Sequence, residues 1–216
     1  MRKTLFILLG LALLLLPAAC CAGTETASPK PTPAGDEFAV PDNFSRYYDP
    51  SGLYSISYPP DWEVNLLVLQ EGERIARERL QDIQSDIDLE GVQLLFMAGV
   101  PQGGGYEPNM IIMVGPRDPD LTSIAAVTSS EVTGIMTVAD SYREISREYT
   151  TIDGRGAAIL EFEVNMSDQK LHDLQMYTTA GGTVWSVACA TSRATGSYSE
   201  YEDDLHAIIR SLRIHD

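Results

Sequence analysis

The chain opens with a long apolar block. Leu5 to Leu16 form an apolar run of 12 residues, preceded by Arg2 and Lys3 and followed by Pro17-Ala18-Ala19. A helix that spans a bilayer needs about 20 such residues, so this run is too short to be a stable membrane helix. A positive start, a short apolar run and small residues after it predict a secretory leader over residues 1–19.

The next segment has neither helical nor strand periodicity. From Ala22 to about Asp42 it consists mainly of Thr, Ser, Ala and Gly, with prolines at 29, 31, 33 and 41. This composition cannot form a core and favours extended chain. We therefore predict a tether over residues 20–43.

From Phe44 onward, apolar positions recur with the periods of strands and helices. Tyr54, Ile56 and Tyr58 alternate with serines, after a strand at 46–48 and the turn Asp49-Pro50-Ser51-Gly52. The same reasoning predicts a helix over 71–88 and strands at 92–97 and 110–114 joined by a glycine-rich loop over 101–109. It also predicts a helix from Leu121 capped by Asp120.

The second half has clearer turn signals. Strands at 147–152 and 158–166 flank Asp153-Gly154, and strands at 171–179 and 183–190 flank Ala180-Gly181-Gly182, which predicts two antiparallel hairpins. Apolar positions from Tyr198 to Leu212 predict a closing helix. The pattern as a whole predicts one α+β domain over residues 44–214.

Several of these segments resemble the PsbP-like domain, the family of the lumenal extrinsic protein of photosystem II and of many bacterial lipoproteins. The resemblance lies in Tyr48-Asp49-Pro50, in Tyr54-Ser55-Ile56-Ser57-Tyr58-Pro59-Pro60-Asp61-Trp62, in the late pair of long strands, and in the C-terminal helix ending Ile208-Ile209-Arg210-Ser211-Leu212. It implies a mostly antiparallel β-sheet of about six or more strands sandwiched by helices, the α/β/α arrangement shared with the Mog1 family. It also implies an accessory or assembly role. The segment 71–88 is an insertion relative to the plant proteins, which argues against a photosynthetic role.

Charge narrows the range of partners. The chain holds 15 basic and 31 acidic residues, a formal charge of −16. Removal of residues 1–19 takes away Arg2 and Lys3 and no acid, which leaves 13 basic residues and −18. Nucleic acid is therefore not an expected partner, and the acidic side chains are read as a solvated surface.

The cysteines divide into a pair and a single residue. Leu16-Pro17-Ala18-Ala19-Cys20 resembles a bacterial lipobox, so Cys20 is the expected lipidation site and the chain is expected to be held to the extracytoplasmic side of a membrane by lipid. Cys21 is a competing acceptor, and the alternative is an ordinary secreted protein cleaved near Ala19 or Ala22. Cys189 stands in an apolar stretch and is predicted to be a buried thiol.

Motifs for chemistry are weak. Asp86-Ile87-Asp88-Leu89-Glu90-Gly91 imitates the start of an EF-hand loop, but its twelfth position is Met97 instead of a bidentate Glu. Gly103-Gly104-Gly105 lacks the Lys-Ser or Lys-Thr of a P-loop. Neither segment is expected to bind an ion or a phosphate, and no cofactor is expected.

The histidines form no H-E-x-x-H pattern. His172 is predicted to be a packed or edge residue, and His206 with Asp203 has the i, i+3 spacing of a surface metal pair or of an ordinary solvated helix face. No G-x-S-x-G elbow is present, and no basic residue or histidine neighbours Cys189. We expect a non-enzymatic accessory or binding module whose partners are a membrane complex or a small ligand. The alternative is an extracytoplasmic hydrolase or metal-dependent enzyme with a site built from scattered residues.

Overall fold

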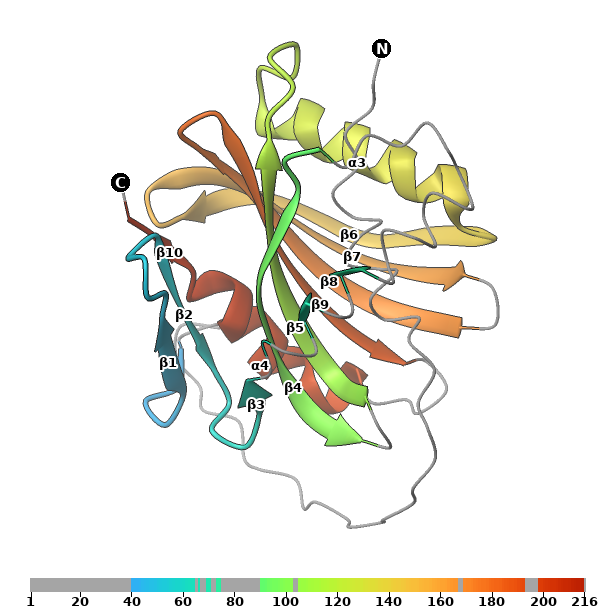
Figure 1. Cartoon of the computed structure of the whole chain (residues 1–216). Coiled ribbons are helices and arrows are strands. Elements are labelled where there is room, and N and C mark those ends of the chain that lie inside the picture. The colour runs from blue at the N-terminus through green and yellow to red at the C-terminus, as the bar shows by residue number, and fades with distance from the viewer. Residues whose placement is uncertain are drawn as a thin grey trace.

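The computed structural model describes residues 40–64, 66, 69, 70, 73, 74, 90–102, 105–166, 169–192 and 198–215. Its elements in chain order are β1 (Ser45–Tyr48), β2 (Tyr54–Tyr58), β3 (Glu63–Val64), β4 (Gln93–Gln102), β5 (Gly105–Pro116), α3 (Ile124–Val138), β6 (Ser141–Ile152), β7 (Arg155–Met166), β8 (Gln169–Ala180), β9 (Thr183–Ser192), α4 (Tyr198–Arg210) and β10 (Arg213–Ile214). Figure 1 shows their arrangement.

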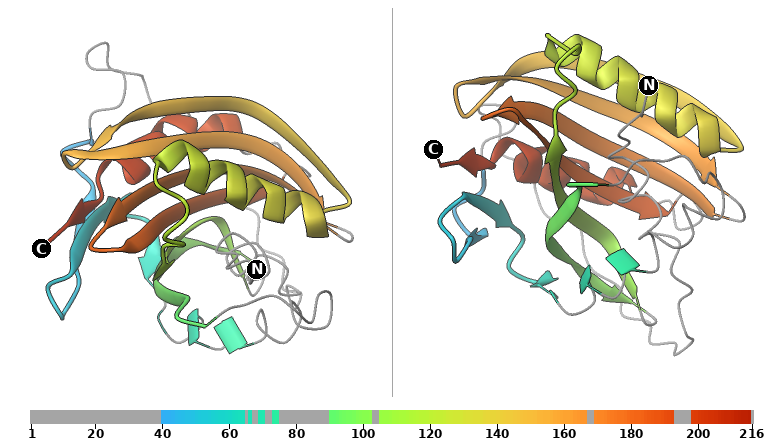
Figure 2. Two further views of the ribbon diagram at one scale, coloured as in Figure 1. Left: turned by 90° about the horizontal axis from the view of Figure 1, so that it is seen from above. Right: turned by 45° about the horizontal axis from the view of Figure 1, so that its top comes forward.

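Two antiparallel sheets organise this described part. Seven of its strands form the main sheet, in the order β3-β4-β5-β9-β8-β7-β6, and three form the small sheet, in the order β1-β2-β10. Helix α3 lies across one face of the main sheet and α4 across the other (Figure 2). The predicted α+β class, with an antiparallel sheet between helices, is confirmed. We call these two faces the α3 face and the α4 face.

Alternation along the strands assigns each side chain to a face. On β7, Leu160, Phe162 and Val164 pack in the core of the α3 face, whereas Ile159 packs in the core of the α4 face. On β9 the assignment continues with Val187 and Cys189 on the α4 face. Each face therefore buries its own apolar cluster, which is why the strand pattern in the sequence is informative.

The two predicted hairpins are confirmed and are longer than the sequence pattern indicated. At the turn between β6 and β7, Asp153 and Gly154 have φ of 51° and 74°. Gly181 and Gly182 have φ of 55° and 80° between β8 and β9. Two successive residues at positive φ are the requirement of a tight turn whose twist matches the flanking strands.

Two details of the prediction are wrong. The loop expected over 101–109 is mostly strand, since β4 runs to Gln102 and β5 begins at Gly105. The cap of α3 is Ser123, not Asp120, because the Ser123 hydroxyl accepts the Ala126 amide at 3.1 Å. The helix predicted over 71–88 lies outside the described residues apart from residues 73 and 74.

The small sheet joins distant parts of the chain. Ile214 of β10 pairs with Tyr54 of β2, and β2 pairs with β1 on its other side. Tyr54 and Ile56 pack with Ile208 and Leu212 in the core of the α4 face. The small sheet and α4 thus cover the same apolar surface.

Candidate functional site

Half-buried polar side chains meet on the α4 face where α4 begins. Glu161 of β7 and His172 of β8 both lie on this face, and His172 Nε2 is 2.9 Å from Glu161 Oε1. Their side chains are 15% and 16% exposed, respectively for His172 and Glu161. We call these two residues with Tyr198 the His172 cluster.

Tyr198, the first residue of α4, packs its ring against the imidazole of His172. The two rings are stacked with centroids 3.5 Å apart and an interplanar angle of 3°. Burial raises the pKa of Tyr198, and the carboxylate of Glu161 raises it further. The tyrosine is therefore a neutral packing surface for His172 and cannot act as a phenolate at neutral pH.

The second oxygen of Glu161 accepts a hydrogen bond from the Ser146 hydroxyl at 3.2 Å. Ser146 consequently donates to the carboxylate, whereas a serine nucleophile would donate to a base such as His172. Ser146, Glu161 and His172 thus form a chain of hydrogen bonds with the carboxylate at its centre. This arrangement orients the histidine and activates no nucleophile.

His206 lies farther along α4 in the same polar surroundings. Burial lowers its pKa, and so does Arg210, while Glu161, Glu148 and Asp203 act in the opposite direction. His206 is therefore neutral at pH 7, as a metal ligand must be. Across the described ranges, however, no three His, Cys, Asp or Glu side chains converge as they would around a metal ion.

The predicted packing of His172 is confirmed: it shares the α4 face with Leu174 and Met176 of the same strand. The sequence did not indicate its partners. Glu161 read as one polar position of an alternating strand, and Tyr198 read as a core residue of a helix 26 positions farther on. Only the register of β7 against β8 and the start of α4 bring the three together.

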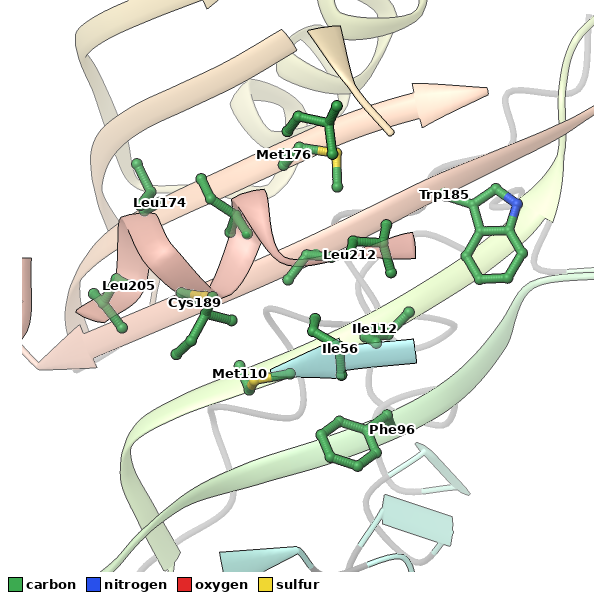
Figure 3. Packing of buried hydrophobic residues seen from close by; sticks show 14 of the residues in the cluster. Ile56, Phe96, Met110, Ile112, Leu174, Met176, Trp185, Cys189, Leu205 and Leu212 are labelled. Carbon is green, nitrogen blue, oxygen red and sulfur yellow. The ribbon is translucent and has the colours of Figure 1, made fainter. Parts of the chain in front are cut away.

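Cys189 is inert in this fold. Its thiol is free and buried, and burial raises its pKa well above the ordinary value. Figure 3 shows it among the apolar side chains of the α4 face, and the ladder places it between Met110 of β5 and Leu174 of β8. The predicted buried thiol is confirmed, and it is neither a nucleophile nor a metal ligand in this state.

The α3 face carries a second polar group, which the sequence analysis missed. Asp173 is 0% exposed and neither of its carboxylate oxygens has a hydrogen-bond partner. Burial raises its pKa to about 8, and the neighbouring Gln175 lowers it only in part. The Tyr177 hydroxyl donates to the side-chain oxygen of Gln175. At neutral pH Asp173 is mostly an uncharged acid within the sheet.

In the sequence, this polar group is indicated only by Asp173, Gln175 and Tyr177, which occupy every second position of β8. That alternation was visible, but only a hairpin strand over 171–179 was predicted from it.

The remaining candidate segments contribute no described site. Cys20, Cys21, the leader and the tether lie outside the described residues, as do Asp86 to Leu89, Gly103 and Gly104. Met97, the twelfth position of the EF-hand imitation, is buried in β4. None of the helices in the described part of the chain combines the length and the apolar character that a bilayer crossing requires.

Comparison with known proteins adds information at the level of the fold. No family model matches the chain, and no curated protein sequence matches it. The solution structure of cyanobacterial PsbP (CyanoP) from Synechocystis is similar, with a TM-score of 0.52 and 16% identity over 86% of this chain and 98% of that one. LpqN, involved in cell envelope biogenesis of Mycobacterium tuberculosis, has a TM-score of 0.49 and 10% identity over 80% of this chain and 91% of its own. The likeness to CyanoP over nearly the whole of that protein shows that this chain has a PsbP-like fold.

Proposed function

We propose that this chain is a lipid-anchored extracytoplasmic accessory protein that binds a partner in a membrane complex and catalyses no reaction. The observation that carries the proposal is the state of the reactive side chains. His172 is held between Glu161 and Tyr198, and Cys189 is enclosed in the apolar core. A fold names no chemistry, so the sites must be judged on these contacts.

The contacts of Glu161 are those of a structural group. Its two oxygens accept from His172 and from Ser146, so both are engaged by side chains of the same sheet. A general base needs a reachable proton on a substrate, and a nucleophile needs a base beside it. In the His172 cluster the contacts orient and pack the side chains, and they provide neither a general base nor an activated nucleophile.

The anchor follows from the sequence. A cysteine at position 20 that carries two acyl chains would bind stably to a bilayer, since each buried methylene contributes about 0.8 kcal/mol. The tether over 20–43 would then hold the domain away from the surface. The charge of −16 favours a partner with basic or neutral surfaces and disfavours nucleic acid.

The proposal is tested by crosslinking in native membranes followed by affinity capture of the tagged full-length chain. Cys20→Ala removes the expected lipid acceptor, and Cys21→Ala is the matched control that leaves it in place. Both variants are also labelled with radioactive palmitate to follow lipidation directly. We expect a recurrent set of membrane proteins and palmitate label with the unaltered chain and with Cys21→Ala, and neither with Cys20→Ala.

Two results would count against the proposal. Equal palmitate label in Cys20→Ala and Cys21→Ala would contradict the assignment of Cys20 as the lipid acceptor. Turnover of a substrate by the purified chain, abolished by His172→Gln or by His206→Gln without loss of folding, would establish the alternative of an extracytoplasmic hydrolase or metal-dependent enzyme.

A further inference from the structure

Strand β6 is an open edge of the main sheet. Within the described part of the chain no strand lies on its outer side, and it is 12 residues long. Figure 2 shows it as the outermost strand next to β7. Two of its large apolar side chains face solvent, Ile145 at 39% and Tyr149 at 52% exposure. Such an edge presents unpaired amide and carbonyl groups that another strand can bond.

The sequence of this edge is complementary to itself. Read from residue 142 to 149 it is Tyr-Arg-Glu-Ile-Ser-Arg-Glu-Tyr. If a second copy lies antiparallel, turned about a point between residues 145 and 146, then Arg143 faces Glu148 and Glu144 faces Arg147. The flanking positions match as well, with Tyr142 opposite Tyr149. Opposite charges and aromatic pairs at facing positions are what stabilise antiparallel strands.

The faces of the sheet also agree with this register. In a symmetric antiparallel pair both copies keep the same face upward, so facing residues must point to the same side. Tyr142 and Tyr149 lie opposite Val164 and Ala158 of β7, both in the core of the α3 face. Glu144 and Arg147 lie opposite Phe162 and Leu160, which belong to the same core.

The other charged pair lies on the opposite side. Arg143 faces Glu163 of β7, and Glu148 faces Ile159, which packs in the core of the α4 face. The Arg143 guanidinium is 2.6 Å from the Glu163 carboxylate, and the Arg210 guanidinium of α4 is 2.9 Å from Glu148. Arg143 and Glu148 therefore share the α4 face, as the register requires.

This agreement depends on a β-bulge. An uninterrupted strand would place residues of opposite parity, such as 144 and 147, on opposite faces. The ladder with β7 shifts between Glu144 and Ser146, so Ile145 is an extra residue and parity changes there. The bulge sits at the centre of the complementary segment, where a two-fold axis would pass.

Glu144 and Arg147 show its effect within one chain. The Arg147 guanidinium lies 2.7 Å from the Glu144 carboxylate, three positions away, because both side chains are on the α3 face. In a symmetric pair each Arg147 would lie between its own Glu144 and that of the second copy.

We propose that two copies of this chain associate through antiparallel pairing of their β6 edges and so extend the main sheet across a two-fold axis. The chain carries a charge of −16, which opposes self-association over most of its surface. Residues 142–149 hold two Arg and two Glu and are locally neutral. Charges and bulges also protect edge strands from random pairing. That protection, however, does not require oppositely charged residues to stand at facing positions and on the same face of the sheet.

The test uses two full-length copies with different tags, produced together and solubilised in detergent. One copy is captured and the other is quantified, and sedimentation of the purified chain gives the dissociation constant. Glu144→Arg alone places arginine opposite arginine, and Arg147→Glu alone places glutamate opposite glutamate. When one copy carries Glu144→Arg and the other Arg147→Glu, both facing pairs are opposite in charge again.

We expect co-capture of unaltered copies, a dissociation constant raised about tenfold or more in each single variant, and recovery in the mixed pair. The internal Glu144–Arg147 ion pair stays broken in the mixed pair, so recovery must come from contacts between copies. Glu63→Arg, an exposed change on β3 at the other edge of the sheet, should have no effect. Thermal unfolding of each variant verifies folding.

A monomeric unaltered chain, single variants that associate like the unaltered chain, or a mixed pair no stronger than the single variants would each overturn the proposal. Capture of other membrane proteins does not bear on it, because the partner here is a second copy of the same chain.

Discussion

The ring of His172 lies parallel to the ring of Tyr198, and the centroids are 3.5 Å apart. The Tyr198 hydroxyl is buried and has no hydrogen-bond partner. We therefore expect Tyr198→Phe to leave the free energy of unfolding within about 0.5 kcal/mol of the unaltered value. Tyr198→Ala removes the stacked ring and should cost about 3 kcal/mol or more. Urea denaturation of the three chains measures the difference, and a large cost for the Phe variant would show that the hydroxyl is needed.

Ser211 joins the end of α4 to β2 through buried hydrogen bonds. Its hydroxyl accepts the Ser57 amide at 2.8 Å and donates to the Ile208 carbonyl at 2.7 Å. Ser211→Ala leaves the buried Ser57 amide without this acceptor, so we expect a loss of about 1–3 kcal/mol in chemical denaturation. Ser199→Ala, at an exposed position of α4, is the matched control and should be neutral. Equal stability of the two variants would contradict the assigned role.

Asp173 should make the stability of the chain depend on pH. Burial raises its pKa from 3.8 to about 8, so between these values the folded chain holds a proton that the unfolded chain has released. Stability from this group is therefore lost as pH rises from about 4 to 8, and the loss is constant above that range. The Asp173→Asn side chain cannot ionise. Its free energy of unfolding, relative to that of the unaltered chain, should therefore rise by a few kcal/mol between pH 5 and pH 8.

This prediction is checked by urea denaturation at both pH values. Asp42→Asn, at an exposed carboxylate before β1, serves as the control. A stability difference between Asp173→Asn and the unaltered chain that stays the same at pH 5 and pH 8 would refute a neutral buried acid.

Cys189 should be unreactive until the chain unfolds. A chain with Cys20→Ala and Cys21→Ala retains Cys189 as its one thiol. We expect no reaction with Ellman's reagent in the native state within hours and complete reaction in urea, because the reagent needs an accessible thiolate. Rapid labelling of the native chain would place the thiol in a cleft open to solvent.

The sequence predicted this fold best where period and turn chemistry agree. Asp153-Gly154 and Gly181-Gly182 mark hairpins whose strands bury alternate residues, and those elements are all present. Asp120 was predicted as the cap of α3 because aspartate is a good cap. Serine is a good cap as well, and only the observed hydrogen bond to the Ser123 hydroxyl selects between the two residues.

The candidate site was much less accessible to such reasoning. The contact between Glu161 and His172 depends on the register of two neighbouring strands, and Tyr198 joins them from a helix. The protonation state of Asp173 depends on its burial in the folded chain, and the sequence of a strand with both polar and apolar residues does not predict that burial. Sequence period identifies which side of an element is buried, but not which polar residues from different elements meet.

The small sheet has a consequence for how the chain acquires its structure. Ser57 and Ser211 are 154 positions apart, and β2 has β10 as its partner on one side. A chain that emerges from the ribosome or from a translocation channel with its N-terminal end first presents β2 long before β10 exists to close against it. The small sheet on the α4 side can therefore be completed only after residue 214 is free, whereas the hairpins β6–β7 and β8–β9 join strands that are neighbours in the chain.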